Sequence, residues 1–246
     1  ILPFSNSKHS DLLINEFVFN PLVEKIILIA DRIYKNGFTI IVTNSLGSSR
    51  TIKKIIDNVY TDYFLLVTKD TPIKLNQFAL ERFISFTKAY DASLVYSDFF
   101  DLKEDSYIPH PLQDYQPGSV RDNFDFGPLL LFSTKKVKDS FKKYGSLTQT
   151  NNAALYELRL RLSTEFFNKK NCIPIVRIPE YLYTQVETDI RTSGEKLFDY
   201  VNPKNREAQK EMELVFTKFL KLIDAYIPPR FSKVYKTKDQ FPVKAS

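Results

Sequence analysis

The feature that most constrains the fold is an alternation of short, continuously apolar runs with segments of helical periodicity. Apolar runs at residues 1–4, 24–30, 38–42, 63–67 and 93–100 predict buried strands. Helical patterns at 11–19, 48–59 and 75–90 lie between most of them, and Ser48 or Ser49 can cap the second. Continuous apolar strands with helical connections are typical of parallel sheets covered on both faces. We therefore predict an α/β chain with a mostly parallel central sheet flanked by helices.

The second half is less regular. We predict strands at 128–133, 175–178 and 181–186, and helices at 135–144, 152–167 and 205–226. The last helix carries an apolar stripe and ends before Pro228, because proline cannot continue a helix. The stripe is suited to packing on the chain's own core or on a second copy in a homodimer.

Composition excludes several kinds of site. With one cysteine, Cys172, and two histidines, the chain cannot form a disulfide framework and can hardly build a zinc site of the usual ligands. It has no Walker or Rossmann glycine motif and no Gly-x-Ser-x-Gly elbow.

No apolar run approaches the roughly 20 residues of a membrane helix. The net charge of +6 is typical of a solvated basic surface; it permits contact with an anionic membrane face, and we expect no nucleic-acid partner.

A single acid, Asp70, closely follows the predicted strand at 63–67. At the carboxyl edge of a parallel sheet, its carboxylate could hold Mg²⁺ or Mn²⁺ together with substrate phosphates. The same segment is also ordinary turn chemistry, Lys69 and Asp70 being followed by a Thr-Pro pair. One acid leaves both interpretations open.

A second polar turn, Thr43-Asn44-Ser45, lies between the strand at 38–42 and the next helix. Its side chains could hydrogen-bond a nucleobase or ribose while the helix N-terminus faces phosphate. Capping of the helix is the alternative interpretation.

The richest cluster of polar residues follows the strand at 93–100. It holds residue types that bind sugar hydroxyls, grip phosphate or move protons: Asp98, His110, Asp114, Arg121, Asp122 and Asp125. We predict a long functional loop at 101–126, because connections of this length inside a compact domain usually serve function. A surface loop of ion pairs is the competing interpretation.

Taken in order, these segments resemble the family-2 glycosyltransferases of the GT-A fold. Residues 1–6 (ILPFSN) are similar to the family's opening strand, 39–45 (TIIVTNS) to the strand ending at its nucleotide turn, and 63–70 (YFLLVTKD) to the strand entering its Asp-x-Asp metal motif. Residues 127–133 (GPLLLFS) and 155–163 (LYELRLRLS) are similar to a later strand and to the acceptor helix. The resemblance covers residues 1–165. Residues 110–116, 121–127, 193–196 and 198–201 are similar to a Bacteroidetes-type subgroup.

Three departures bear on chemistry. Thr68 replaces the first acid of the metal motif, and Asn44 stands where the nucleotide turn usually has Asp. Ala154 and Leu155 occupy the place of the Glu-Asp pair that supplies the family's general base. Neither side chain can take a proton, so the base cannot be carried over.

The resemblance implies roles for particular residues. Nucleotide binding would fall to Pro3, Ser5, Asn44, Ser45 and Lys69, and metal binding to Asp70. Sugar or acceptor binding would fall to His110, Asp114 and Arg121. The candidates for the missing base are Asp98, Asp122, Asp125 and Glu157.

The implied activity is transfer of a sugar from a nucleotide-diphosphate donor to a glycan or lipid-linked acceptor, with inversion. The implied setting is cell-surface polysaccharide or lipopolysaccharide synthesis, in the cytoplasm or peripheral to the inner membrane. The alternative is a catalytically degenerate module that binds a nucleotide sugar or glycan. Nucleotidyl transfer ranks last, because the glycine-rich basic loop expected for it is missing.

We expect one GT-A-like domain over residues 1–200. Its nucleotide-sugar-binding half would span 1–100 and its acceptor half 101–200. A C-terminal helix and extended tail over 201–246 would pack on the same domain.

Overall fold

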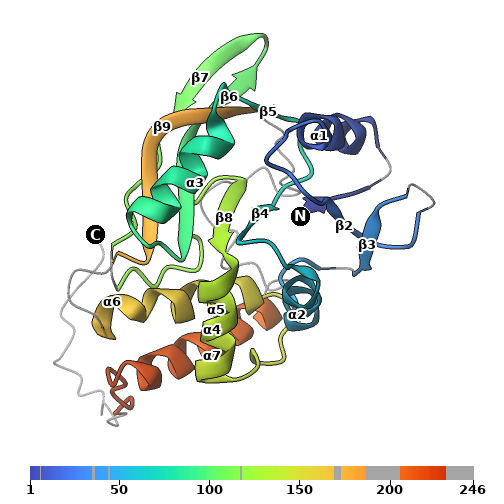
Figure 1. The fold of residues 1–246 in the computed structure, drawn as a ribbon. Coiled ribbons are helices and arrows are strands. Elements are labelled where there is room, and N and C mark those ends of the chain that lie inside the picture. Colours follow the sequence, from blue (N-terminus) through green and yellow to red (C-terminus); the bar gives the residue numbers. More distant parts are fainter. Residues whose placement is uncertain are drawn as a thin grey trace, which may run out of the picture.

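The computed structural model describes residues 1–5, 7–34, 37–43, 45–116, 118–168, 173–186 and 206–230. Figure 1 shows strands packed against helices, with the β6–β7 hairpin projecting at one end and helices α4, α5 and α7 gathered at the other. The resulting architecture is α/β, as the alternation of strands and helices predicts.

The first sheet contains three parallel strands, β1 (Leu2–Pro3), β2 (Ile27–Ala30) and β3 (Thr39–Val42). The order is β1-β2-β3, with Leu2 opposite Leu28 and Ile27 opposite Thr39. Helix α1 (Lys8–Val18) connects β1 to β2. Ser7 caps its N-terminus, because the Ser7 side chain accepts a hydrogen bond from the Ser10 backbone N–H.

The second sheet has six strands in the order β4-β8-β6-β9-β5, with β7 paired to β6. They are β4 (Tyr63–Val67), β5 (Ile73–Leu75), β6 (Leu94–Lys103), β7 (Ser106–His110), β8 (Leu129–Ser133) and β9 (Ile175–Val186). Strand β6 is parallel to β9, and every other pairing in this sheet is antiparallel.

Two hydrogen bonds join the sheets. The Ile1 amino group donates to the Leu65 carbonyl oxygen at 2.7 Å, and the Val67 backbone N–H donates to the Ile1 carbonyl oxygen at 2.9 Å. Bonds from one residue to two positions spaced by two are the pattern of a parallel pair. Strand β1 therefore runs beside β4 in the same direction, and the carboxyl ends of β1, β2, β3 and β4 share one edge.

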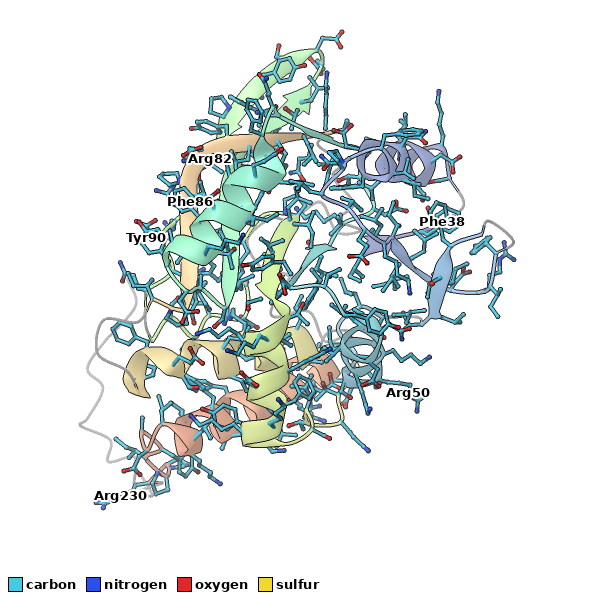
Figure 2. The ribbon with its side chains drawn as sticks, viewed as in Figure 1. Phe38, Arg50, Arg82, Phe86, Tyr90 and Arg230 are labelled. Atoms are coloured by element: carbon cyan, nitrogen blue, oxygen red, sulfur yellow. The ribbon has the colours of Figure 1, made fainter. Side chains whose placement is uncertain are left out.

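The other helices are α2 (Ser49–Asn58), α3 (Ala79–Ala89), α4 (Thr134–Tyr144), α5 (Ala154–Ser163), α6 (Glu165–Asn168) and α7 (Arg206–Leu222). Ser48 caps α2 by accepting from the Thr51 backbone N–H. On α3, the Arg82 guanidinium lies over the Phe86 ring, which stacks on Tyr90 (Figure 2). These three side chains follow the helical spacing of four residues and cover one outer face of α3.

Helix α5 is buried nearly all round, and α7 covers one side of it. A small apolar cluster joins the two helices: Ala153, Tyr156, Leu160, Val215 and Phe219. The stripe predicted on the last helix thus packs on the chain's own core. The prediction of a C-terminal helix is confirmed.

The prediction of a mostly parallel central sheet is wrong, because the six-stranded sheet is mixed and mostly antiparallel. It rested on helices between successive strands, and such crossovers do return the chain in parallel. No helix lies between β7 and β8 in the described residues of that connection, so β8 enters between β4 and β6 in the opposite direction.

Three other predicted boundaries change. The expected loop at 101–126 begins with a hairpin, since β6 continues to Lys103 and β7 pairs back along it. Strand β5 occupies the start of the helix predicted at 75–90, which begins instead at Ala79. The strands predicted at 175–178 and 181–186 are one strand whose register against β6 shifts beside Asp98. Pro179 lies at that shift, where a missing N–H is tolerated.

Residues 193–196 and 198–201, and the tail beyond 230, lie outside the described residues. Within the described part of the chain, no helix combines the length and apolarity needed to cross a membrane.

We predict that Phe219→Ala lowers the free energy of unfolding by about 3 kcal/mol, because it leaves a cavity between α7 and α5. Phe219 is 4% exposed. The control is Leu214→Ala on the exposed side of α7, which should change stability by less than about 0.5 kcal/mol. Urea unfolding measures both. Equal effects would show that α7 does not depend on this contact.

Candidate functional site

The carboxyl edge of the parallel strands carries a cluster of hydroxyl groups. The Ser5 backbone N–H donates to Ser10 Oγ at 3.0 Å, and the hydroxyls of Ser5, Ser7 and Ser10 lie within 3.0 to 3.2 Å of one another. Ser10 Oγ also donates to Asp70 Oδ1 at 3.3 Å. The loop after β1 and the turn after β4 therefore meet, as their places in the sequence predict.

The neighbouring predicted residues lie close to this contact in the chain. Lys69 is exposed and Pro3 is half-buried at the end of β1. Thr68, in the place of the metal motif's first acid, donates its backbone N–H to the Pro128 carbonyl oxygen at 2.9 Å. This bond connects the turn after β4 to the segment that enters β8.

The polar turn after β3 opens on a hollow of about 940 Å³. Asn44 lies outside the described residues, but Ser45 lines the hollow and donates to the Asn151 carbonyl oxygen at 2.8 Å. The charged residues that line it are all basic: Arg50, Lys53 and Lys54. Arg50 projects outward from α2 (Figure 2). A lining whose charged side chains are basic suits an anionic ligand.

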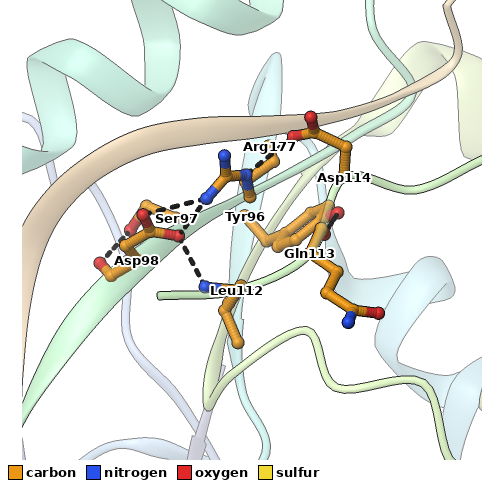
Figure 3. Close-up of polar contacts among 7 residues, drawn as sticks. All are labelled: Tyr96, Ser97, Asp98, Leu112, Gln113, Asp114 and Arg177. Carbon is orange, nitrogen blue, oxygen red and sulfur yellow. Dashed lines mark hydrogen bonds and ion pairs between the residues drawn. The ribbon is translucent and has the colours of Figure 1, made fainter. Parts of the chain in front are cut away.

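Asp98 lies inside the sheet rather than on a loop, and it is 4% exposed. Arg177 Nη1 donates to both its oxygens at 2.9 and 3.0 Å, and the Leu112 backbone N–H adds a bond of 2.9 Å (Figure 3). Arg177 Nε bonds Asp114 Oδ1 at 2.7 Å. Burial opposes the charge of Arg177, but hydrogen bonds to Asp114 and Asp98 raise its pKa overall. Asp98 therefore serves as the buried half of an ion pair.

Glu157 is likewise the acidic partner of a buried ion pair. It is buried on α5, where it accepts hydrogen bonds from Arg161 Nη2 at 2.6 Å and from the Thr148 backbone N–H at 2.8 Å. These contacts fix the loop before α5 and leave the carboxylate shielded from solvent.

Arg121 and Asp122 are exposed, on a loop that the buried side chain of Arg159 holds in place. Arg159 Nη2 donates to the Arg121 carbonyl oxygen at 2.7 Å. Its guanidinium lies over the rings of Tyr115, Phe126 and Tyr156 at 4.8 to 5.8 Å. Burial lowers the pKa of Arg159 and raises that of Tyr156 to about 12, so Tyr156 stays neutral and donates to the loop.

His110 contacts Asp125 and also Asp101, a residue that sequence reasoning missed. His110 Nδ1 lies 2.7 Å from Asp101 Oδ2, and His110 Nε2 lies 3.3 Å from Asp125 Oδ2. Gln185 Nε2 donates to the other oxygen of Asp101 at 2.7 Å. Asp101 falls in the predicted loop. Had the strand predicted at 93–100 been extended to Lys103, where β6 ends, Asp101 would have been placed on the same face as Phe99.

Comparison with known proteins identifies the fold without a sequence relative. No protein family model matches the chain, and no curated protein matches its sequence. Among solved structures, S. aureus TarS 1–349, a family-2 glycosyltransferase, matches at a TM-score of 0.54 and 12% identity. That match covers 90% of this chain and 62% of the TarS chain. The chain has a GT-A fold.

A second TarS structure of the same region, in complex with UDP-GlcNAc, matches at a TM-score of 0.50 and 13% identity. It covers 89% of this chain and 70% of that one. At 12–13% identity the structural match shows the fold alone, so the chemistry must be argued from this chain's own residues.

Within the GT-A fold, the start of α5 is closed by backbone contacts. The Ala154 backbone N–H donates to the Gly47 carbonyl oxygen at 2.9 Å, and a Cβ at Gly47 would lie 2.6 Å from the Asn152 carbonyl oxygen. Only glycine allows this approach. The position where the resemblance expects a base thus holds the buried methyl group of Ala154.

We predict that Arg177→Met lowers the free energy of unfolding by about 3 kcal/mol, because it leaves the Asp98 carboxylate buried without its partner. Denaturant unfolding measures the loss. The control is Asp114→Asn, which removes the exposed side of the same network and should cost less than about 1 kcal/mol. A smaller loss for Arg177→Met than for the control would contradict the structural role of the buried pair.

Proposed function

We propose that this chain is a glycosyltransferase that moves a sugar from a nucleotide-diphosphate donor to an acceptor hydroxyl. The observation that carries the proposal is the meeting of Asp70 with the Ser5–Ser10 loop at the carboxyl edge of β1 and β4, in a GT-A fold. TarS, which shares the fold, has been solved with UDP-GlcNAc. UDP-GlcNAc is therefore the donor that we propose.

The proposed metal is Mg²⁺ or Mn²⁺ at Asp70. Among the described residues, no group of three or more His, Cys, Asp or Glu side chains could hold a metal by itself. One carboxylate still fits Mg²⁺, which commonly binds one or two carboxylates and completes its shell with substrate phosphates and water. The ion would supply Lewis-acid stabilisation of the departing diphosphate.

The chain's residues suggest how the donor would be held. The hydroxyls of Ser5 and Ser7 can bond phosphate or ribose oxygens, and exposed Lys69 can pair with phosphate. The basic hollow beside Ser45 offers further contacts to an anionic ligand. These groups lie at ends of parallel strands, where open α/β sheets bind their ligands.

We further propose that transfer inverts the anomeric carbon and that the acceptor is a glycan or a lipid-linked glycan. Both rest on the resemblance to family-2 enzymes. The same resemblance favours a place in cell-surface polysaccharide or lipopolysaccharide assembly, on the cytoplasmic side of the inner membrane. The net charge of +6 suits contact with that anionic surface.

We predict that UDP-GlcNAc with Mn²⁺ raises the thermal midpoint of the protein, because a ligand that binds the folded state stabilises it. The measurement is a thermal-shift panel of UDP-, GDP-, CMP- and dTDP-sugars, each with and without Mn²⁺. If none of these donors raises the thermal midpoint, the proposed function is refuted. A shift without any release of UDP would identify a binding module.

Asp70→Ala is expected to slow metal-dependent release of UDP from UDP-GlcNAc by roughly 100-fold or more, because metal stabilisation of the leaving group is worth several kcal/mol. The matched control is Asp62→Ala, at the opposite end of β4, where the carboxylate is exposed. UDP release is followed with a coupled assay over a Mn²⁺ titration. Unchanged metal dependence in Asp70→Ala would remove Asp70 from this role.

A further inference from the structure

The strands β7, β6 and β9 display an ordered row of rings on one face. His110, Phe99 and Tyr183 lie in register across the three strands. The His110 ring stacks on Phe99 at 4.3 Å between centroids, and Phe99 stacks on Tyr183 at 5.2 Å. Two of these rings are fully buried, so the plane of the imidazole is fixed from behind.

The next row on the same face fixes the imidazole from its edge. Asp101 lies two residues beyond Phe99 and in register with Gln185. One Asp101 oxygen lies 2.7 Å from His110 Nδ1 and the other accepts from Gln185 Nε2 at 2.7 Å. The Asp101 side chain is 14% exposed. A carboxylate only accepts, so Nδ1 carries the hydrogen of this bond, and in the neutral imidazole the lone pair is then on Nε2.

The other ring nitrogen, Nε2, faces Asp125, which lies on the segment that reaches the donor edge. Nε2 lies 3.3 Å from Asp125 Oδ2, and Asp125 Oδ1 accepts from the Gly127 backbone N–H at 2.9 Å. The next residue, Pro128, accepts from the Thr68 N–H. A Cβ at Gly127 would lie 2.4 Å from the Tyr183 hydroxyl, so the segment is held tightly against β9. His110 is therefore linked through four residues to the turn that carries Asp70.

His110 is also open to a ligand, unlike two of the four acids considered as the base. Its side chain is 37% exposed and that of Asp125 is 57% exposed. Asp98 and Glu157 hold buried ion pairs, and Ala154 stands in the family's position. The Asp125 carboxylate in front of Nε2 is exposed, so an acceptor hydroxyl can take its place and donate to the neutral ring, as general-base catalysis requires.

We propose that His110 is the catalytic base of the transfer and that Asp101 is its positioning residue, an inference that rests on the proposed function. His110 Nε2 takes the proton of the acceptor hydroxyl while the hydroxyl oxygen forms a bond to the anomeric carbon of the donor sugar. The bond from that carbon to the diphosphate oxygen breaks, and its electron pair leaves with the diphosphate. Asp101 and Asp125 stabilise the imidazolium that forms, which returns its proton to water.

The test measures UDP release from UDP-GlcNAc, with water or a panel of glycan acceptors as nucleophile. His110→Gln is expected to lower kcat by about 100-fold or more, the usual contribution of a general base, while calorimetric binding of UDP-GlcNAc is unchanged. Asp101→Asn, which keeps the imidazole but favours the wrong tautomer, should lower kcat by about 10-fold or more. Added imidazole should restore activity to His110→Ala, a rescue that a purely structural histidine would not show.

The matched control is Asp105→Asn, the same change of chemistry at the exposed turn of the same hairpin. Asp105 has a positive φ of 63°, which asparagine adopts readily, so kcat should stay at the wild-type value. If His110→Gln and Asp101→Asn retain wild-type kcat, or if His110→Gln loses donor binding, the inference is overturned. Loss of activity in Asp125→Asn alone would make Asp125 the base instead.

The proposed function and this inference fail in different ways. Absence of UDP-GlcNAc binding in the wild-type protein refutes the donor itself. Binding without UDP release from any nucleophile refutes catalysis, and His110 with it, while donor binding stands. If the His110 variants unfold, Asp101→Asn tests the inference instead, because this variant keeps the imidazole. A reduced kcat supports the inference, and a wild-type kcat overturns it.

Discussion

The arrangement of the molecule depends on the backbone pairing of β1 with β4. Ile1 exchanges hydrogen bonds with Leu65 and Val67, and this pairing joins three parallel strands to the mixed sheet. Buried backbone groups must be paired, so strands in the interior of a sheet hold their neighbours in a fixed direction. The shared direction brings the turn after β4 beside the loop after β1, and the contact of Asp70 with Ser10 follows from it.

Buried charge then determines which acids remain available for chemistry. Asp98 is held by Arg177 between β6 and β9, and Glu157 is held by Arg161 along α5. Removing either partner would strand a charge in the interior, so these acids act as scaffold. Of the four acids considered for the base, Asp122 and Asp125 are the exposed ones, and both lie on the segment after β7. Sites that exchange protons with a substrate need that access, and the division of labour among carboxylates follows from burial alone.

Local patterns were enough to predict much of the fold. The strand at 63–67 and the capped helix α2 were predicted nearly to the residue, because apolar runs and helical spacing are read within one segment. The direction of β8 was not, since it depends on which strands lie on either side of it in space. The meeting of Asp70 with Ser10 was foreseeable from strand ends. The contacts of Asp101 with His110 and Gln185 were not, because they require the register of three strands.

The β6–β7 hairpin projects at one end of the molecule (Figure 1), and its outer strand contains a proline that limits further pairing. Among the described residues, β7 pairs only with β6, so its other side presents backbone groups that could recruit a foreign strand. Pro109 lies within β7, opposite Phe100, and supplies no N–H for a new ladder. The exposed side chains of Tyr107 and Ile108 make that block useful. A protruding arm of this kind can remain solvent-exposed without nucleating edge-to-edge assembly.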